Sequence, residues 1–284
     1  MNESFYIPQP VVGNDLTLRT SSPTGNPIVS KEDGKAAADA LMTEVSELEA
    51  LMYGAGTHRV LLVLQGLDAS GKDGLVRFVI GRGDPVTTVV SSFKMPTPLE
   101  VGHDFLWRVH QAVPPRGMVG IFNRSHYEDV VATHVRGSIS AALQEQRIGH
   151  IRAFESLLVD DGTIIIKCYL HIDASEQASR LLAREQELIT AWKLAPDDWH
   201  DRELFTTYLD VYSTILAQTS TSAAPWYVVP ANRKWYRNLV IAGLLRLHML
   251  PFRDGWIRTL QQMQTDRIAA IQAVRAHTET GTKA

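Results

Sequence analysis

The chain has 284 residues, of which 45% are hydrophobic and 21% are charged, and its formal net charge is −3. This composition is typical of a globular protein long enough for one large α/β domain. The small negative charge and the lack of any known nucleic-acid-binding module argue against a nucleic-acid partner. The one cysteine, Cys168, excludes a disulfide framework within the chain.

The N-terminus carries no basic segment followed by an apolar one, so it does not resemble a signal peptide. No apolar run approaches the roughly 20 residues that a membrane-spanning helix needs. We therefore expect a cytoplasmic protein with no membrane partner.

Residues 1–30 are rich in Pro, Gly, Ser, Thr and Asn, which predicts an extended or partly disordered N-terminal arm. Residues 31–53 have apolar side chains at helical spacing, and Gly54 and Gly56 end that helix. We expect the rest of the chain, residues 31–284, to form a single domain.

Beyond the first helix, short apolar runs alternate with amphipathic segments. The predicted strands are 60–64, 86–92, 118–122, 163–170 and 226–229. The predicted helices are 72–82, 99–113, 139–160, 175–189, 202–219, 238–249 and 256–277, with a loop over 194–199. This alternation predicts an α/β fold with a parallel sheet covered on both faces. Ligands of such folds bind beyond the carboxyl ends of the strands, so polar residues there are the candidates for function.

The first strand leads into a glycine-rich turn and a lysine, and Gly66, Gly71 and Lys72 fit the spacing of a phosphate-binding loop. Glycines allow backbone N–H groups to surround an anion, the helix N-terminus adds positive charge, and the lysine reaches the phosphates. The residues expected to contact phosphate are Gly66, Ala69, Ser70, Gly71, Lys72, Asp73 and Gly74. Position 73 is Asp where the common loop has the Ser or Thr that holds magnesium. With the second carboxylate at Asp68, this suggests a P-loop enzyme of an unusual kind.

Polar residues also follow the third strand, where Asn123 and Arg124 are followed by Glu128 and Asp129. In P-loop enzymes a carboxylate after a neighbouring strand holds magnesium. The spacing alone equally allows Asn123 to cap the next helix while both carboxylates face solvent. Other cations near predicted strand ends are Lys94, Arg108, Arg233, Lys234 and Arg237, which are anion ligands or ordinary surface charges.

Taken together, five stretches resemble the family-2 polyphosphate kinases. They are Gly66-Leu-Asp-Ala-Ser-Gly-Lys-Asp-Gly74, Ser92-Phe-Lys-Met-Pro-Thr97, His103-Asp-Phe-Leu-Trp-Arg108, Phe122-Asn-Arg-Ser-His-Tyr-Glu-Asp129, and residues 225–238 around Asn-Arg-Lys-Trp-Tyr-Arg. The resemblance covers roughly residues 30–250. It implies a P-loop kinase-like three-layer sandwich, similar to thymidylate kinase, with a helical lid near residues 175–200.

The stretch Asn123-Arg-Ser-His-Tyr-Glu128 resembles the subgroup of that family that accepts AMP and often ADP. Members restricted to nucleoside diphosphates tend to have Asp-Arg-Ser-Trp-Tyr-Asn instead. Two stretches depart from the family pattern. The lid stretch Glu187-Leu-Ile-Thr-Ala-Trp-Lys193 keeps only the Trp-Lys end, and Asn232 stands where an Asp is usual.

The resemblance implies transfer of a phosphoryl group from inorganic polyphosphate to AMP or ADP. It assigns catalytic roles to Asp68, Lys72, Arg124, Glu128 and Asp129, with Asp68 and Asp129 binding Mg²⁺, or alternatively Mn²⁺. Further phosphate contacts would come from Lys94, Arg108, Lys234 and Arg237, with Lys94 and Arg108 lining the polyphosphate channel. Nucleotide or lid contacts would come from Asn123, Tyr127, Arg180 and Arg184. Family members commonly form dimers or tetramers, so we also expect a homo-oligomer.

Alternatives remain open at this point. A polyphosphate kinase restricted to ADP or GDP would share the fold and the loop. A conventional ATP-dependent nucleoside monophosphate kinase would also use the loop, and it would not respond to polyphosphate. A non-catalytic anion-binding protein would keep the loop without needing Asp68, Asp73, Glu128 and Asp129.

Overall fold

Five strands form one parallel sheet in a computed structural model that describes residues 6–13, 15–194 and 196–281. They are β1 (Arg59–Gln65), β2 (Thr88–Ser92), β3 (Val119–Asn123), β4 (Thr163–His171) and β5 (Trp226–Pro230). Their order across the sheet is β2-β3-β1-β4-β5, and every pair is parallel. After β1 the chain runs to β2 at one edge of the sheet, and after β3 it runs to β4 on the other side of β1. The connections from these two neighbouring strands diverge, and the crevice that binds ligands in such sheets lies beyond the carboxyl ends of the diverging strands.

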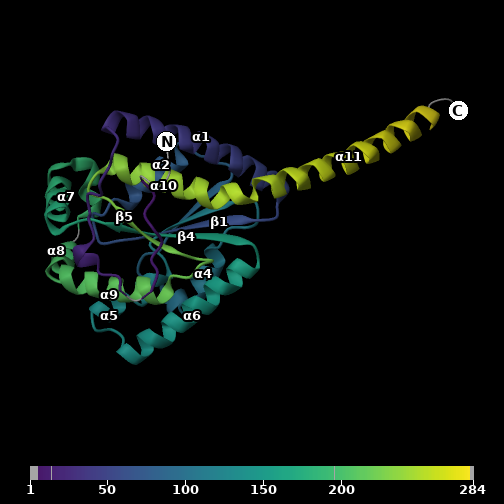
Figure 1. The fold of residues 1–284 in the computed structure, drawn as a ribbon. Helices are drawn as coiled ribbons and strands as arrows, with labels where there is room; N and C mark the ends of the chain where they lie inside the picture. The colour runs from purple at the N-terminus through teal and green to yellow at the C-terminus, as the bar shows by residue number, and fades with distance from the viewer. Residues whose placement is uncertain (1–5, 14, 195, 282–284) are drawn as a thin grey trace.

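Helices cover both faces of the sheet, as Figure 1 shows. One face carries α1 (Lys31–Ala55), α2 (Lys72–Ile80) and α10 (Lys234–Met249), and the other carries α4 (Trp107–Ala112), α6 (Ala141–Asp160) and α9 (Phe205–Thr219). Alternate residues of β1 face opposite cores, since Leu62 packs in the first and Leu61 in the second. This arrangement confirms the predicted three-layer α/β fold.

Three predicted elements are wrong in detail. The helix expected over 99–113 is two short ones, α3 (Pro98–Val101) and α4, because Asp104 Oδ1 accepts a hydrogen bond from the Leu106 N–H (2.9 Å) and starts a new turn. The loop expected over 194–199 is largely helical, because α8 (Pro196–Glu203) begins with a proline and two aspartates, which favour a helix N-terminus. Helix α10 begins at Lys234, four residues before the predicted start.

The described part of the N-terminal arm is extended and lies along the outer strand β5. The Val11 N–H donates to the Trp226 carbonyl (2.8 Å), and the Asn232 N–H donates to the Pro23 carbonyl (3.0 Å). Leu18, in the short 3₁₀ helix η2 (Leu18–Thr20), is fully buried in the second core. The arm therefore covers the free edge of the sheet at β5. Residues 1–5 and 14 of the predicted arm lie outside the described residues.

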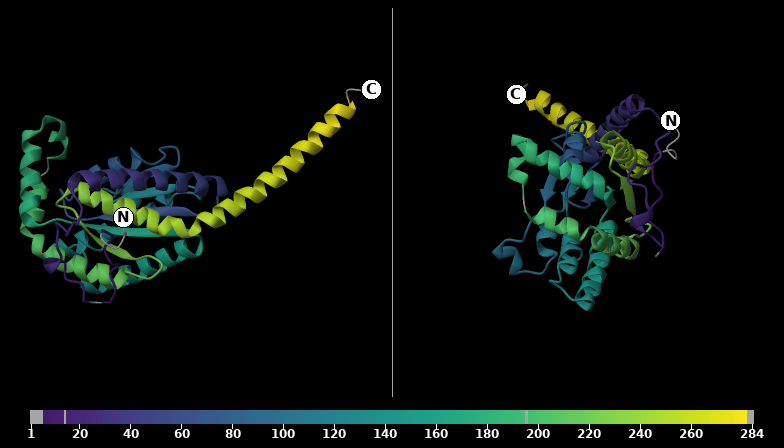
Figure 2. Two further views of the ribbon diagram at one scale, coloured as in Figure 1. Left: turned by 45° about the horizontal axis from the view of Figure 1, so that its top comes forward. Right: turned by 90° about the vertical axis from the view of Figure 1, so that its left-hand side faces the viewer.

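Two helical segments extend away from this body. We call residues 174–194 and 196–203, which comprise α7 (Ala174–Gln186), the 3₁₀ helix η4 (Leu188–Lys193) and α8, the projecting hairpin. It stands out at one side of the body in Figure 2. Helix α11 (Arg253–Gly281), which follows the short η5 (Leu250–Phe252), packs on the first core through Trp256 and Leu260 and then leaves the body (Figure 1). In the part of the chain that the structure describes, no helix has the length and apolar character to cross a bilayer.

Candidate active site

The loop between β1 and α2 holds its backbone in left-handed conformations at three positions. Gly66 has φ +147°, and a Cβ there would lie 2.7 Å from the Leu170 carbonyl oxygen, so this position requires glycine. Gly71 has φ +99°, and Ala69 has φ +63° although it is not a glycine. A non-glycine residue in this region is strained by roughly 1 kcal/mol or more, and such strain is typical of functional sites.

The side chain of Lys72 is folded inside this loop and is 8% exposed. Its Nζ donates to the carbonyl oxygens of Gly66 (2.6 Å) and Leu67 (3.1 Å). Burial, and secondarily the positive charge of Arg124, lower the pKa of Lys72 to about 8. The ammonium group is therefore held at the centre of the loop, and its charge is sensitive to pH near neutrality.

Two arginines support the loop from behind. Arg237, which is 3% exposed, donates from Nη1 to the Gly71 carbonyl (2.9 Å), and Arg180 donates from Nη1 to the carbonyls of Ala69 (3.0 Å) and Ser70 (3.1 Å). Burial and the neighbouring Arg180 lower the pKa of Arg237 to about 10. The carbonyls of Ala69, Ser70 and Gly71 are thus turned toward the arginines, whereas those of Gly66 and Leu67 are turned toward Lys72.

The end of β3 lies against the loop. Arg124 has φ +63°, and its N–H donates to the Leu64 carbonyl (3.0 Å). Its guanidinium donates to Asp68 Oδ1 (2.6 Å) and lies 3.9 Å from Glu128. Asn123 donates from Nδ2 to Asp73 Oδ1 (2.8 Å), so the residue that replaces the usual Ser or Thr has a fixed partner.

The carboxylates after β3 lie in a 3₁₀ turn, η3 (His126–Asp129), which is capped by Ser125 rather than by Asn123. Their side chains are 23% and 13% exposed at Glu128 and Asp129, so they are not solvated surface groups. Asp129 pairs with Arg108 (3.0 Å). Burial raises the pKa of Glu128, against the opposing effect of Arg124.

A polar network beneath Glu128 fixes its orientation. The Gln65 amide, oriented to satisfy its neighbours, donates to Glu128 Oε1 (2.9 Å) and accepts from the Ser125 N–H (3.1 Å). The Tyr212 hydroxyl, on α9, lies 3.0 Å from the same amide nitrogen. The Gln65 side chain of β1 thus fixes the Glu128 carboxylate relative to the sheet.

These groups border a cleft of about 500 Å³ at the carboxyl ends of β1, β2 and β3. The predicted site residues that line it are Gly66, Asp68, Lys94, Arg108, Arg124, Glu128 and Asp129. The sequence did not single out several others, namely Gln177, Arg136, Asp197, Asp198, Asp201, Tyr208 and Tyr212. Arg136 pairs with Asp201 (2.5 Å). Neither residue directly follows a predicted strand, so the rule that ligands bind beyond strand ends does not select them. The proline followed by two aspartates at the start of α8 is the signal that could have found Asp197 and Asp198.

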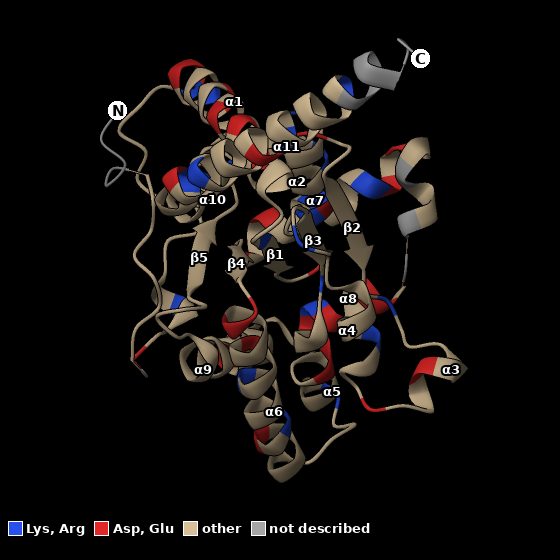
Figure 3. Cartoon of the chain, turned by 90° about the vertical axis from the view of Figure 1, so that its right-hand side faces the viewer, with Lys and Arg blue, Asp and Glu red and all other residues tan. Residues whose placement is uncertain are grey.

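The other predicted site residues do not line this cleft, namely Ala69, Ser70, Gly71, Lys72, Asp73, Gly74, Asn123, Tyr127, Arg180, Arg184, Lys234 and Arg237. Arg180 and Arg237 contact the loop backbone as described above, and Tyr127 is fully buried in the second core. Lys234 is exposed at the first residue of α10. Arg184 pairs with Asp198 across the projecting hairpin (2.9 Å), so it reaches the cleft through that partner. Figure 3 shows acidic and basic residues interspersed over the molecule rather than separated into one basic face.

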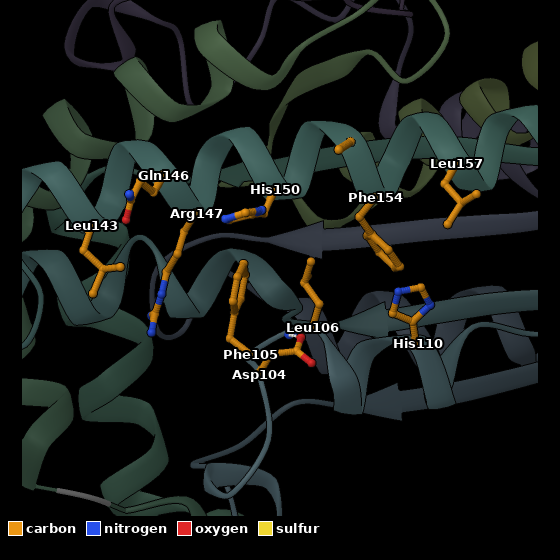
Figure 4. Close-up of a pocket in the computed structure, with 11 residues that line it drawn as sticks. Asp104, Phe105, Leu106, His110, Leu143, Gln146, Arg147, His150, Phe154 and Leu157 are labelled. Atoms are coloured by element: carbon orange, nitrogen blue, oxygen red, sulfur yellow. Dashed lines mark hydrogen bonds between the residues drawn. The ribbon is translucent and has the colours of Figure 1, made fainter.

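A second hollow lies between α4 and α6 and is lined mostly by apolar side chains, including Phe105 and Phe154 (Figure 4). Arg147 lies over the Phe105 ring, with its guanidinium 5.0 Å from the ring centroid. The same guanidinium donates from Nη1 to the Asp129 carbonyl (2.7 Å). This hollow therefore borders the turn that carries the site carboxylates.

A profile of the Polyphosphate kinase 2 (PPK2) family matches residues 28–251. The chain belongs to the polyphosphate kinase 2 family. It is 44% identical over 218 residues to an AMP/ADP-polyphosphate phosphotransferase of Meiothermus ruber, across 75% of this chain and 82% of the relative. It is 36% identical to an ADP-polyphosphate phosphotransferase of Rhodopseudomonas palustris, across 81% of this chain and 84% of the relative.

A crystal structure of a polyphosphate kinase 2 from Arthrobacter aurescens has the same fold. It superposes with a TM-score of 0.83 at 38% identity, over 89% of this chain and 90% of that one. These similarities confirm the predicted family, the P-loop kinase type of fold and a polyphosphate-dependent phosphotransferase activity.

Proposed function

We propose that this polyphosphate kinase 2 phosphorylates both AMP and ADP, taking a terminal phosphoryl group from inorganic polyphosphate each time. The proposal rests on the cleft, where Gly66 and Asp68 of the phosphate loop face the carboxylates of η3 and a set of cations. The relatives from Meiothermus and Rhodopseudomonas are named for AMP/ADP and for ADP, which supports the same acceptors here.

The reaction needs no strong base in the protein. The nucleophile is a phosphate oxygen of the acceptor, which is already anionic near neutral pH. The main task is to bring two polyanions together in line and to spread the charge of a loose transition state. Lys72 and the loop N–H groups would hold the phosphates at the transfer point, and Arg124 would stabilise the group in transfer.

The cations at the mouth of the cleft suit a repeating anion. Lys94 is exposed and lines the cleft, and Arg108 is fixed by its bonds to the Lys94 carbonyl (2.9 Å) and to Asp129. Arg136 adds a third positive charge on the same border. We assign the polyphosphate chain to this side of the cleft, because ammonium and guanidinium groups both bind phosphate oxygens.

The site residues suit a magnesium ion that binds together with the phosphates of the substrates. Within the described residues, no three His, Cys, Asp or Glu side chains form a preformed metal cage. Mg²⁺ is usually held by one or two carboxylates together with substrate phosphates and water, and Asp68 and Asp129 both face the cleft. When bound, Mg²⁺, or Mn²⁺ in its place, would neutralise charge on the phosphate oxygens. Glu128, held by Gln65, would orient the acceptor.

The projecting hairpin is proposed as the lid of a single domain that spans residues 31–284. Asp197 and Asp198 on α8 line the cleft, and Arg184 ties that helix to α7. Closure of the hairpin would remove water from the transfer point. The extended arm, a cytoplasmic location and assembly into a dimer or tetramer complete the proposal.

A product assay tests the proposed acceptors. The protein is mixed with Mg²⁺ and long-chain polyphosphate, with AMP in one reaction and ADP in another, and the nucleotides are separated over time. We expect AMP to give ADP and then ATP. Conversion of ADP alone would favour the kinase restricted to diphosphates, and phosphorylation of AMP by ATP but not by polyphosphate would favour the conventional kinase.

A further inference from the structure

The second core contains a buried ion pair that the proposed reaction does not use. Lys167, in the middle of β4, is fully buried, and its Nζ lies 2.5 Å from Glu155 Oε2 on α6. Glu155 is 3% exposed. Burying two charges is costly, and apolar residues of similar volume often stabilise a fold as well or better. The pair therefore calls for an explanation other than stability.

Two of the groups around the pair belong to the site turn, and Lys167 Nζ also donates to the Thr219 carbonyl of α9 (2.8 Å). The Tyr127 hydroxyl donates to Glu155 Oε1 (2.8 Å), and Lys167 Nζ lies 3.2 Å from the same hydroxyl. His126 Nε2 lies 3.4 Å from Glu155 Oε1. These two residues begin η3, and the next two are Glu128 and Asp129.

The turn transmits this anchoring to the cleft. Neighbouring side chains of a 3₁₀ turn point about 120° apart, so an inward Tyr127 turns the adjacent Glu128 side chain away from the core. Tyr127 is further fixed by Trp226, whose ring centroid lies 4.9 Å away in an edge-to-face contact. The other end of the turn is held by the same helix, because Arg147 of α6 donates to the Asp129 carbonyl (2.7 Å).

We propose that the Glu155–Lys167 pair is a positioning device for phosphoryl transfer, which fixes Tyr127 and thereby aims Glu128 and Asp129 into the cleft. Neither member of the pair lines the cleft, so both act through Tyr127 as positioning residues. This inference rests on the proposed function. Misaimed carboxylates affect the transition state more than substrate binding, so the effect falls on kcat rather than on KM.

Double variants separate this role from folding. A single substitution leaves an unpaired buried charge, so both charges are removed together, in Glu155→Leu/Lys167→Met and in Glu155→Gln/Lys167→Met. The glutamine keeps an oxygen that accepts a hydrogen bond from the Tyr127 hydroxyl, whereas the leucine has no acceptor. We expect the Leu/Met protein to fold with kcat lowered about 10- to 100-fold and KM within about threefold, and the Gln/Met protein to recover most of kcat.

Tyr127→Phe provides a second measurement that keeps the ion pair and the core volume. Tyr127→Phe should fold and reproduce the loss of kcat. If the Leu/Met protein does not fold, this variant alone tests the positioning role. A folded Leu/Met protein with wild-type kcat, equal kcat in the two double variants, or an unchanged Tyr127→Phe enzyme would each overturn the inference. The wild type is assayed with polyphosphate and with ATP as donors. If it uses only ATP, the proposed function fails, and the same kcat comparison with ATP still tests the positioning role.

Discussion

The two sides of the cleft differ in how their side chains are held. On the strand-end side, which we take as residues 66–74 and 123–129, the backbone is strained at Ala69 and Arg124 and supported by Arg180 and the buried Arg237. On the projecting hairpin, Leu188 is 92% and Trp192 72% exposed. The strand-end side is thus preformed by its backbone contacts, whereas the hairpin has the few packed contacts expected of the proposed lid.

Removing Lys72 should have the largest effect, because Lys72 is the lysine of the phosphate loop on the strand-end side. We expect Lys72→Ala to lower kcat about a thousandfold, since the cation stabilises the group in transfer. The measurement is steady-state kinetics with polyphosphate and AMP. Lys35→Ala, an exposed lysine of α1, serves as the control. Near-normal turnover of Lys72→Ala would refute the assigned mechanism.

Arg237→Met tests whether support from behind makes the strand-end side rigid. The methionine fills the space but leaves the Gly71 carbonyl without its donor, which lets the loop turn out of its binding conformation. We expect kcat to fall about 10- to 100-fold and Tm to fall by several degrees. The exposed Arg258→Met is the control. If Arg237 instead contacts phosphate directly, KM for polyphosphate should rise while Tm stays unchanged.

The pH profile of kcat/KM sharpens the comparison further. Burial lowers the pKa of Lys72 to about 8, so the free enzyme carries the cation below that pH and loses it above. We expect kcat/KM to fall about tenfold per pH unit above pH 8, because kcat/KM reports groups of the free enzyme. Bound phosphates restore the charge, so kcat should fall less. A kcat/KM that stays flat to pH 10 would contradict the buried position of this ammonium group.

Arg184→Ala should have the smallest effect, because its ion pair with Asp198 lies within the projecting hairpin. The substitution removes the ion pair with Asp198, in which the Arg184 side chain is 23% and the Asp198 side chain 18% exposed. We expect KM for the nucleotide to rise about three- to tenfold, since a partly exposed pair contributes about 1 kcal/mol to closure, with kcat within about twofold. Arg152→Ala, exposed on α6, is the control. A large loss of kcat would show that the hairpin belongs to the preformed side.

The sequence predicts the strand-end side well and the hairpin poorly, for physical reasons. Parallel strands bring their carboxyl ends to one edge, so apolar runs followed by polar residues place Asp68, Arg124 and Asp129 together. Which arginines face an anion depends on contacts between distant segments. Arg237 follows a strand as a ligand would, and only the packed structure shows it bonded to Gly71. Tyr127 lies among polar neighbours in sequence, whereas the turn directs it into the core.

The long terminal helix has a consequence for how the molecule moves in solution. Residues beyond Leu260 extend the 29-residue α11 past the body for roughly 30 Å at 1.5 Å per residue. A compact body of about 250 residues has a radius of gyration near 18 Å, so this rod is comparable with the body in size. A lone chain should therefore sediment slowly for its mass and tumble anisotropically. Truncation after Leu260 should give the frictional ratio of a sphere-like particle.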